Sequence, residues 1–122
     1  MARKALVVDD SPSMRSLVVS TLKSAGFEVV EASNGKMALD VADRTGVLDL
    51  VVTDLDMPLL DGIAFVRELR TRPSFKYVPV LLLTTATRIE QKSKAREAGA
   101  TGWLTKPFEP AQLLATVKRV LP

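Results

Sequence analysis

The stretch of sequence that decides the fold runs from Leu50 to Gly62 and reads LVVTDLDMPLLDG. It opens with the continuous apolar run Leu50–Val52, which is typical of a strand covered on both faces. The run leads directly to Asp54, and the turn pair Asp61-Gly62 then precedes a helical pattern. The stretch therefore predicts a buried strand followed by a helix, and the apolar residues at helical spacing are expected in the core: Leu60, Phe65, Val66 and Leu69.

The same alternation of strand and helix occurs five times along the chain. The predicted strands are Ala5–Val8, Glu28–Ala32, Leu50–Thr53, Val80–Thr84 and Gly102–Leu104. The predicted helices are Pro12–Ala25, Lys36–Arg44, Ile63–Thr71, Ile89–Ala98 and Pro110–Val120. Capping residues support these boundaries, since Ser11-Pro12 suits a helix start and Gly26 and Gly99 suit helix ends.

Five β-α units of this size predict an α/β fold, a single doubly wound domain with a parallel sheet and helices on both faces. The 122 residues fit one domain covering positions 1–122. Ligands in such sheets bind at the carboxyl ends of the strands. We therefore expect the functional residues at the carboxyl ends of the predicted strands.

The composition excludes several classes of function. The chain has no cysteine, which excludes disulfides and thiolate metal sites and leads us to expect a cytoplasmic location. It also has no histidine, which excludes catalysis by that residue. No apolar run approaches the length of a membrane span. The net charge is +3, but the basic residues are scattered and only 5% of residues are aromatic, so neither a nucleic acid nor a membrane is expected as a partner.

Polar side chains stand at the predicted carboxyl ends of four strands. They are Asp9-Asp10, Asp54, Thr84 and Lys106, the last following the fifth strand. Carboxylates gathered at one edge repel one another unless a cation lies among them, and ligands that are all oxygen favour Mg²⁺. A carboxylate can accept a phosphoryl group, and position alone leaves the choice of nucleophile open, with Asp54 the better candidate.

These residues carry a resemblance to a known family. The runs Val7–Arg15 and Asp54–Gly62 resemble segments of response regulator receiver domains of two-component systems, and the second fits the pattern D-x-x-M-P-x-x-D-G. Thr84 and Lys106-Pro107-Phe108 match further family positions, and the resemblance extends from Lys4 to Leu121. It implies a CheY-like, flavodoxin-like sheet of strand order 2-1-3-4-5.

The resemblance also implies a role for each site residue. Asp54 would accept a phosphoryl group from a phosphohistidine on a histidine kinase or a histidine phosphotransfer protein. Asp10 and Asp54 would bind Mg²⁺ through carboxylate oxygens, Asp9 would bind it directly or through water, and Asp56 would add its backbone carbonyl. Lys106, followed by a cis peptide bond, and Thr84 would contact the phosphoryl group. Such a protein is a signalling switch with slow autodephosphorylation, and not an enzyme in the usual sense.

The switch implied by the family links Thr84 to an aromatic residue on the fifth strand, here Trp103. Their movement would alter the face formed by the fourth helix, the fifth strand and the fifth helix, through which a downstream protein binds. Basic residues on this face lead to the hypothesis of an acidic partner: Arg88, Lys92, Lys94, Arg96, Lys118 and Arg119.

Other interpretations of the same residues remain. Asp9-Asp10 could cap the following helix, Thr84 could simply end a strand, and Trp103 could be a core residue. A pseudo-receiver would bind partners without phosphorylation, although such proteins tend to lose residues that this chain retains. A Mg²⁺-dependent phosphatase of the haloacid dehalogenase type is a further alternative, but Met57-Pro58 does not continue its D-x-D-x-[TV] pattern.

Overall fold

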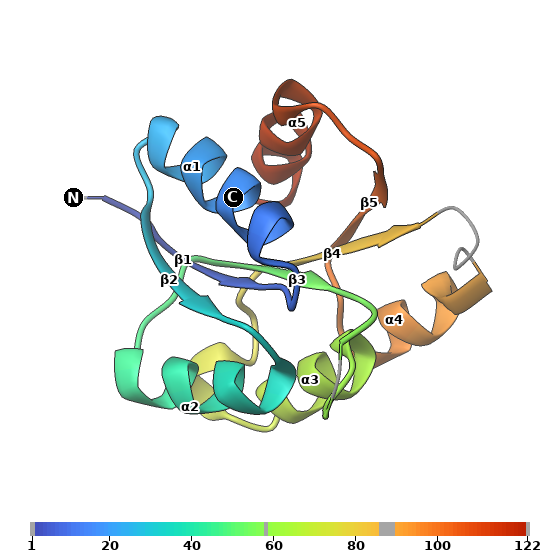
Figure 1. Ribbon diagram of the computed structural model, residues 1–122. Coiled ribbons are helices and arrows are strands. Elements are labelled where there is room, and N and C mark those ends of the chain that lie inside the picture. The colour runs from blue at the N-terminus through green and yellow to red at the C-terminus, as the bar shows by residue number, and fades with distance from the viewer. Residues whose placement is uncertain (1, 58, 86–89, 122) are drawn as a thin grey trace.

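The computed structural model describes residues 2–57, 59–85 and 90–121. Within these residues five parallel strands form one sheet of order β2-β1-β3-β4-β5, and helices follow the strands (Figure 1). The strands are β1 (Lys4–Val8), β2 (Glu28–Ala32), β3 (Leu50–Asp54), β4 (Val80–Thr85) and β5 (Gly102–Lys106). The helices are α1 (Pro12–Ser24), α2 (Gly35–Thr45), α3 (Gly62–Leu69), α4 (Lys92–Ala98), α5 (Pro110–Val120) and the 3₁₀ helix η1 (Pro73–Phe75).

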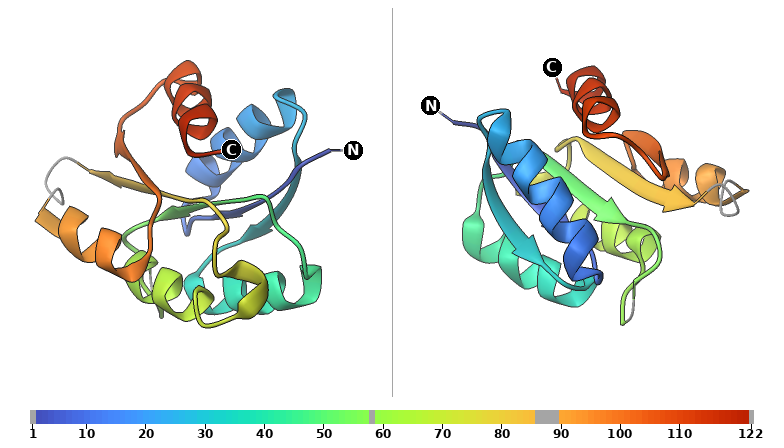
Figure 2. Two further views of the ribbon diagram at one scale, coloured as in Figure 1. Left: turned by 180° about the vertical axis from the view of Figure 1, so that it is seen from behind. Right: turned by 45° about the horizontal axis from the view of Figure 1, so that its top comes forward.

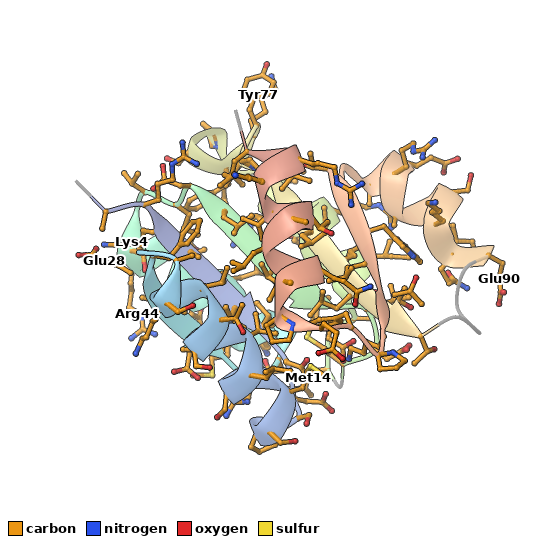
Figure 3. All side chains as sticks on the ribbon, turned by 90° about the horizontal axis from the view of Figure 1, so that it is seen from above. Lys4, Met14, Glu28, Arg44, Tyr77 and Glu90 are labelled. Carbon is orange, nitrogen blue, oxygen red and sulfur yellow. The ribbon has the colours of Figure 1, made fainter. Side chains whose placement is uncertain are left out.

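The helices cover both faces of the sheet. Helices α1 and α5 pack on one face, and α2, α3 and α4 pack on the other (Figures 1 and 2). Seen from above, α1 and α5 lie side by side over the strands (Figure 3). Alternate residues of the central strands supply the two apolar layers, since Val51 packs with α3 while Leu50 and Val52 pack with α1 and α5. The predicted doubly wound architecture and its strand order are confirmed.

The register of the sheet brings the carboxyl ends of β1 and β3 together. Val8 lies opposite Thr53, so Asp9 and Asp54 are the next residues along two neighbouring strands. The loop after β3 closes tightly at Gly62, where an added Cβ would come within 2.5 Å of the carbonyl oxygen of Asp54. Glycine is therefore required in the Asp61-Gly62 turn, and Asp61 caps α3 by accepting a hydrogen bond from Ala64 N at 2.8 Å.

The last two strands run further than the sequence predicts. Strand β5 continues through Lys106 instead of ending at Leu104, because Thr105 and Lys106 pair with Thr84 and Thr85 of β4.

Helix α4 begins at Lys92 after a 3₁₀ turn, whereas its predicted start, Ile89, lies outside the described residues. None of the helices that the structure describes is long and apolar enough to cross a membrane.

Candidate functional site

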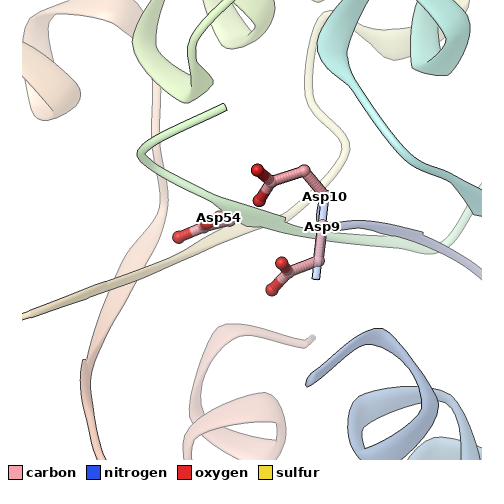
Figure 4. A group of neighbouring side chains, drawn as sticks. All are labelled: Asp9, Asp10 and Asp54. Carbon is pink, nitrogen blue, oxygen red and sulfur yellow. The ribbon is translucent and has the colours of Figure 1, made fainter. Parts of the chain in front are cut away.

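Three carboxylates meet where β1 and β3 end. Asp9 and Asp10 follow β1 and Asp54 ends β3 (Figure 4). One oxygen of each lies within 4.8 Å of the others. Asp9 and Asp54 are buried, with 1% and 6% of their surface exposed, whereas Asp10 is exposed. The structure therefore brings together the three acids that the sequence placed at this edge.

The two oxygens of Asp9 have different surroundings. Oδ1 accepts a hydrogen bond from Ser11 N at 2.9 Å, at the start of α1. Oδ2 is buried and accepts no hydrogen bond from any residue that the structure describes. The N-cap of α1 is Ser11, whose hydroxyl accepts a hydrogen bond from Met14 N, so Asp9 does not cap the helix. The second oxygen of Asp9 is left for a different partner.

Lys106 is the cation nearest to the cluster among the described residues. Its Nζ donates a hydrogen bond to Asp54 Oδ1 at 3.0 Å and lies 3.8 Å from Asp9 Oδ2. The Lys106-Pro107 peptide bond is cis, as the resemblance implies. Lys106 is the last residue of β5, so an edge strand delivers the ammonium group to a carboxylate of the central strand.

Burial makes the ionised state of both inner carboxylates unfavourable. It raises the pKa of Asp54 above its ordinary value, against the opposing effect of the Lys106 ammonium. Burial also raises the pKa of Asp9, against the opposing effects of the Ser11 N–H and Lys106. A single ammonium does not neutralise three acids, so the site is suited to an additional cation.

The residues present fit a hard divalent cation. Their donors are carboxylate oxygens within one ion's reach, and Asp9 Oδ2 is a buried oxygen without a hydrogen bond from the described residues. Mg²⁺ prefers such oxygen ligands and retains several waters. Beside the cluster is a hollow of about 300 Å³, which leaves room for those waters and is lined by Asp10, Leu55, Asp56, Met57, Asp61, Ile63 and Gln91.

Thr84 and Trp103 are not part of the cluster. Thr84 is buried, and its hydroxyl donates to the carbonyl of Thr85 at 3.4 Å. Thr84 pairs with Thr105, two residues beyond Trp103, so Thr84 and Trp103 face the same side of the sheet. Trp103 is half-buried against the core beneath α4. The two residues of the implied switch are therefore diagonal neighbours.

Sequence reasoning assigned no role to two features near the site. Arg15 donates to the backbone carbonyl of Asp9 at 2.7 Å and pairs with Glu31 at 3.2 Å, which ties the end of β1 to α1 and β2. Leu59, in the loop after β3, has a left-handed φ of 69° and is 80% exposed. Arg15 stands in the quoted motif, but Leu59 gave no sequence signal. Pro58 and Arg88, which the sequence analysis named, lie outside the described residues.

Comparisons with known proteins agree with this geometry. The family model for the response regulator receiver domain matches residues 5–118. Chemotaxis protein CheY-3 of Vibrio cholerae is 36% identical over 118 residues, which cover 96% of this chain and 90% of that protein. The solved structure of chemotaxis response regulator CheY4 of Vibrio cholerae has a TM-score of 0.94 and 44% identity, covering 99% of this chain and 100% of that one.

A longer relative shows the same similarity over part of its length. The alkaline phosphatase synthesis transcriptional regulatory protein PhoP of Bacillus subtilis is 39% identical over 121 residues, which cover 99% of this chain but 49% of PhoP. Similarity thus extends both to proteins of this size and to regulators about twice as long. The family match, the sheet order and the acidic cluster together show that the chain belongs to the response regulator receiver domains, the CheY-like signalling switches of two-component systems.

Proposed function

We propose that Asp54 accepts a phosphoryl group from a phosphohistidine of a histidine kinase or a histidine phosphotransfer protein. The observation that carries this proposal is the position of the Asp54 carboxylate. It is buried at the end of a central strand, 3.0 Å from the Lys106 ammonium and within 4.8 Å of oxygens of Asp9 and Asp10. Receiver domains bind Mg²⁺ at an acidic pocket of this kind.

In the proposed reaction an Asp54 oxygen attacks the phosphorus of the donor. The new O–P bond forms as the N–P bond breaks, and the histidine nitrogen leaves with the electron pair of that bond. Lys106 stands where its ammonium can balance negative charge on a phosphoryl oxygen. The transfer produces an acyl phosphate on Asp54, and slow attack by water on that phosphate would restore the carboxylate.

Asp9, Asp10 and Asp54 would hold Mg²⁺ through their carboxylates, Asp9 directly or through water, with the backbone carbonyl of Asp56 as a further ligand. The bound ion would supply positive charge that stabilises the transferred phosphoryl group. The free Oδ2 of Asp9 supports this assignment, because the described residues give that buried oxygen no hydrogen bond. The Asp56 side chain is exposed and lies outside the carboxylate cluster.

The proposed output is a change in the face formed by α4, β5 and α5. Thr84 would turn its hydroxyl from the carbonyl of Thr85 toward the phosphoryl group, and Trp103 would then repack beneath α4. Exposed basic residues of this face pair with no carboxylate of the described residues: Lys92, Lys94, Arg96, Lys118 and Arg119. A partner with an acidic surface suits this face, and high salt should weaken that complex.

Intact mass spectrometry after incubation with acetyl phosphate tests the phosphoacceptor. The wild type should gain one phosphoryl group in the presence of Mg²⁺ and none with a chelator. Asp54→Ala should gain none, whereas the matched control Asp40→Asn should retain the gain, because Asp40 is an exposed acid of α2 outside the cluster. A gain that survives in Asp54→Ala contradicts the assignment of the acceptor.

The same experiment separates the alternatives. A pseudo-receiver would gain no phosphoryl group and would not bind beryllofluoride, which mimics the acyl phosphate. A short-lived acyl phosphate would give no mass gain but would still allow beryllofluoride to bind. A phosphatase would turn over an added phosphomonoester continuously, which the proposed switch does not.

A further inference from the structure

Arg70 connects the end of α3 to the end of α4. It is the C-cap residue of α3, and its guanidinium donates to the carbonyl of Gly99 from both Nε (3.2 Å) and Nη2 (2.6 Å). Its Nη1 donates to the carbonyl of Phe75 at 2.8 Å. Arg70 is half-buried and forms no ion pair with the described residues, and its protein partners are backbone carbonyls.

The C-terminal end of α4 is built around this arginine. Gly99 caps α4 with a left-handed φ of 112°, and an added Cβ would lie 2.9 Å from Nε of Arg70. Just beyond it, Thr101 N donates to the carbonyl of Val80 at 2.8 Å, and Val80 N donates to the Thr101 hydroxyl at 3.0 Å. This end of the helix is therefore fixed to α3, to η1 and to β4.

Among the residues that the structure describes, the N-terminal end of α4 has fewer attachments. Its N-cap residue, Gln91, makes no side-chain capping bond, and the first three residues of the helix, Lys92–Lys94, are exposed. The buried residues are Ala95 and Ala98, which present only methyl groups to the core. Segments with little buried apolar surface and uncapped ends open at low cost, so the two ends of α4 differ in how firmly they are held.

A small cavity separates α4 from β5. Its volume is about 50 Å³, and it is lined by Lys92, Ala95, Arg96, Ala100, Thr101, Gly102 and Trp103. The indole N–H of Trp103 is buried and has no acceptor among the described residues. The cavity leaves space beside Trp103 between α4 and the sheet.

We propose that Arg70 is a positioning residue that makes the C-terminal end of α4 the fixed point of the helix. When the protein is phosphorylated, the remainder of α4 then rotates about Gly99, and its packing on Trp103 changes. The anchor is a property of the resting protein, and only the choice of phosphorylation as the trigger rests on the proposed function.

Amide hydrogen exchange of the unphosphorylated protein tests the anchor. Arg70→Met should raise exchange at Gly99 and Ala100 at least about tenfold, because hydrogen bonds from a charged donor are lost. Arg70→Lys can replace only some of the hydrogen bonds that the guanidinium donates, so it should give an intermediate rise in exchange at these amides. The matched control Arg72→Met removes a guanidinium that pairs with Asp43 of α2, and it should leave exchange at Gly99 unchanged. Unchanged exchange at Gly99 and Ala100 in both Arg70 variants would overturn the proposal.

A second measurement tests the pivot. Trp103 fluorescence would be compared at equal phosphoryl occupancy, with intact mass measured on the same samples. Arg70→Met should take up the phosphoryl group as the wild type does, yet show a smaller Trp103 response, while Arg72→Met should match the wild type. An equal response in Arg70→Met contradicts the pivot. Absence of uptake by the wild type would contradict the proposed function instead, and the exchange data would still decide the anchor.

Discussion

Strands β3 and β5 each deliver a charged side chain to the site, but they are buried to different extents. All five residues of β3 are buried, and it pairs with β1 on one side and β4 on the other. All five residues of β5 are half-buried, and it pairs with β4 alone. The Asp54 carboxylate, the proposed phosphoryl acceptor, therefore stands on a part of the molecule that cannot move without breaking the core. The edge strand, which carries Lys106 and Trp103, can adjust at lower cost.

The largest expected effect of this difference in burial is on stability, and it can be measured by truncating one leucine in each strand. Leu50 of β3 and Leu104 of β5 both pack into the core layer beneath α1 and α5, but Leu50 is fully buried and Leu104 only half-buried. Leu50→Ala should lower the free energy of unfolding by about 2–5 kcal/mol, and Leu104→Ala by roughly half as much. Urea denaturation monitored by circular dichroism measures both, and equal losses would contradict the contrast between the strands.

The contact between the two strands can be measured with a double-mutant cycle. Lys106→Met leaves the buried carboxylates of Asp54 and Asp9 without their ammonium partner, whereas Asp54→Asn removes one of the charges that repel. We expect the two changes to be non-additive, with a favourable coupling of about 1–2 kcal/mol in the free energy of unfolding without Mg²⁺. Strict additivity would mean that the hydrogen bond at 3.0 Å contributes nothing to stability.

A smaller effect is expected from a single carboxylate beside β3. Burial raises the pKa of Asp9, so its charge is unfavourable in the folded protein without a metal. Asp9→Asn should raise the free energy of unfolding without Mg²⁺ by about 1 kcal/mol and weaken the stabilisation that Mg²⁺ provides. Thermal melts with and without Mg²⁺ test this, and Asp10→Asn, which changes an exposed acid, is the matched control. A loss of stability in metal-free Asp9→Asn would contradict the conclusion that the buried charge of Asp9 is unfavourable.

The central part of the molecule could be predicted from sequence because its signals are local. A continuous apolar run specified β3, and the rule that parallel strands share one carboxyl edge brought Asp9, Asp10 and Asp54 together. Phe65, Val66 and Leu69 are fully buried, as their helical spacing predicts, while Leu60 is only half-buried.

The edge of the sheet could not be predicted as well, because tertiary contacts decide it. The residues Thr105 and Lys106 are polar and end the apolar pattern, yet pairing with β4 keeps them in β5. The anchoring of α4 by Arg70 joins residues 29 apart in sequence, and no local pattern encodes it. The left-handed conformation of Leu59 could not be predicted from the sequence either, since leucine has no preference for a positive φ.

The central claim is that a change at Asp54 alters the conformation of β5. The most direct test is to measure Trp103 fluorescence during a beryllofluoride titration in the presence of Mg²⁺. Trp103 is the only tryptophan of the chain, so the signal reports on one position. We expect emission to change with saturation in the wild type, to change less in Thr84→Ala, and not to change in Asp54→Asn. Unchanged emission of the wild type, while a raised melting temperature shows that beryllofluoride has bound, would contradict the proposed link between Asp54 on β3 and the edge strand.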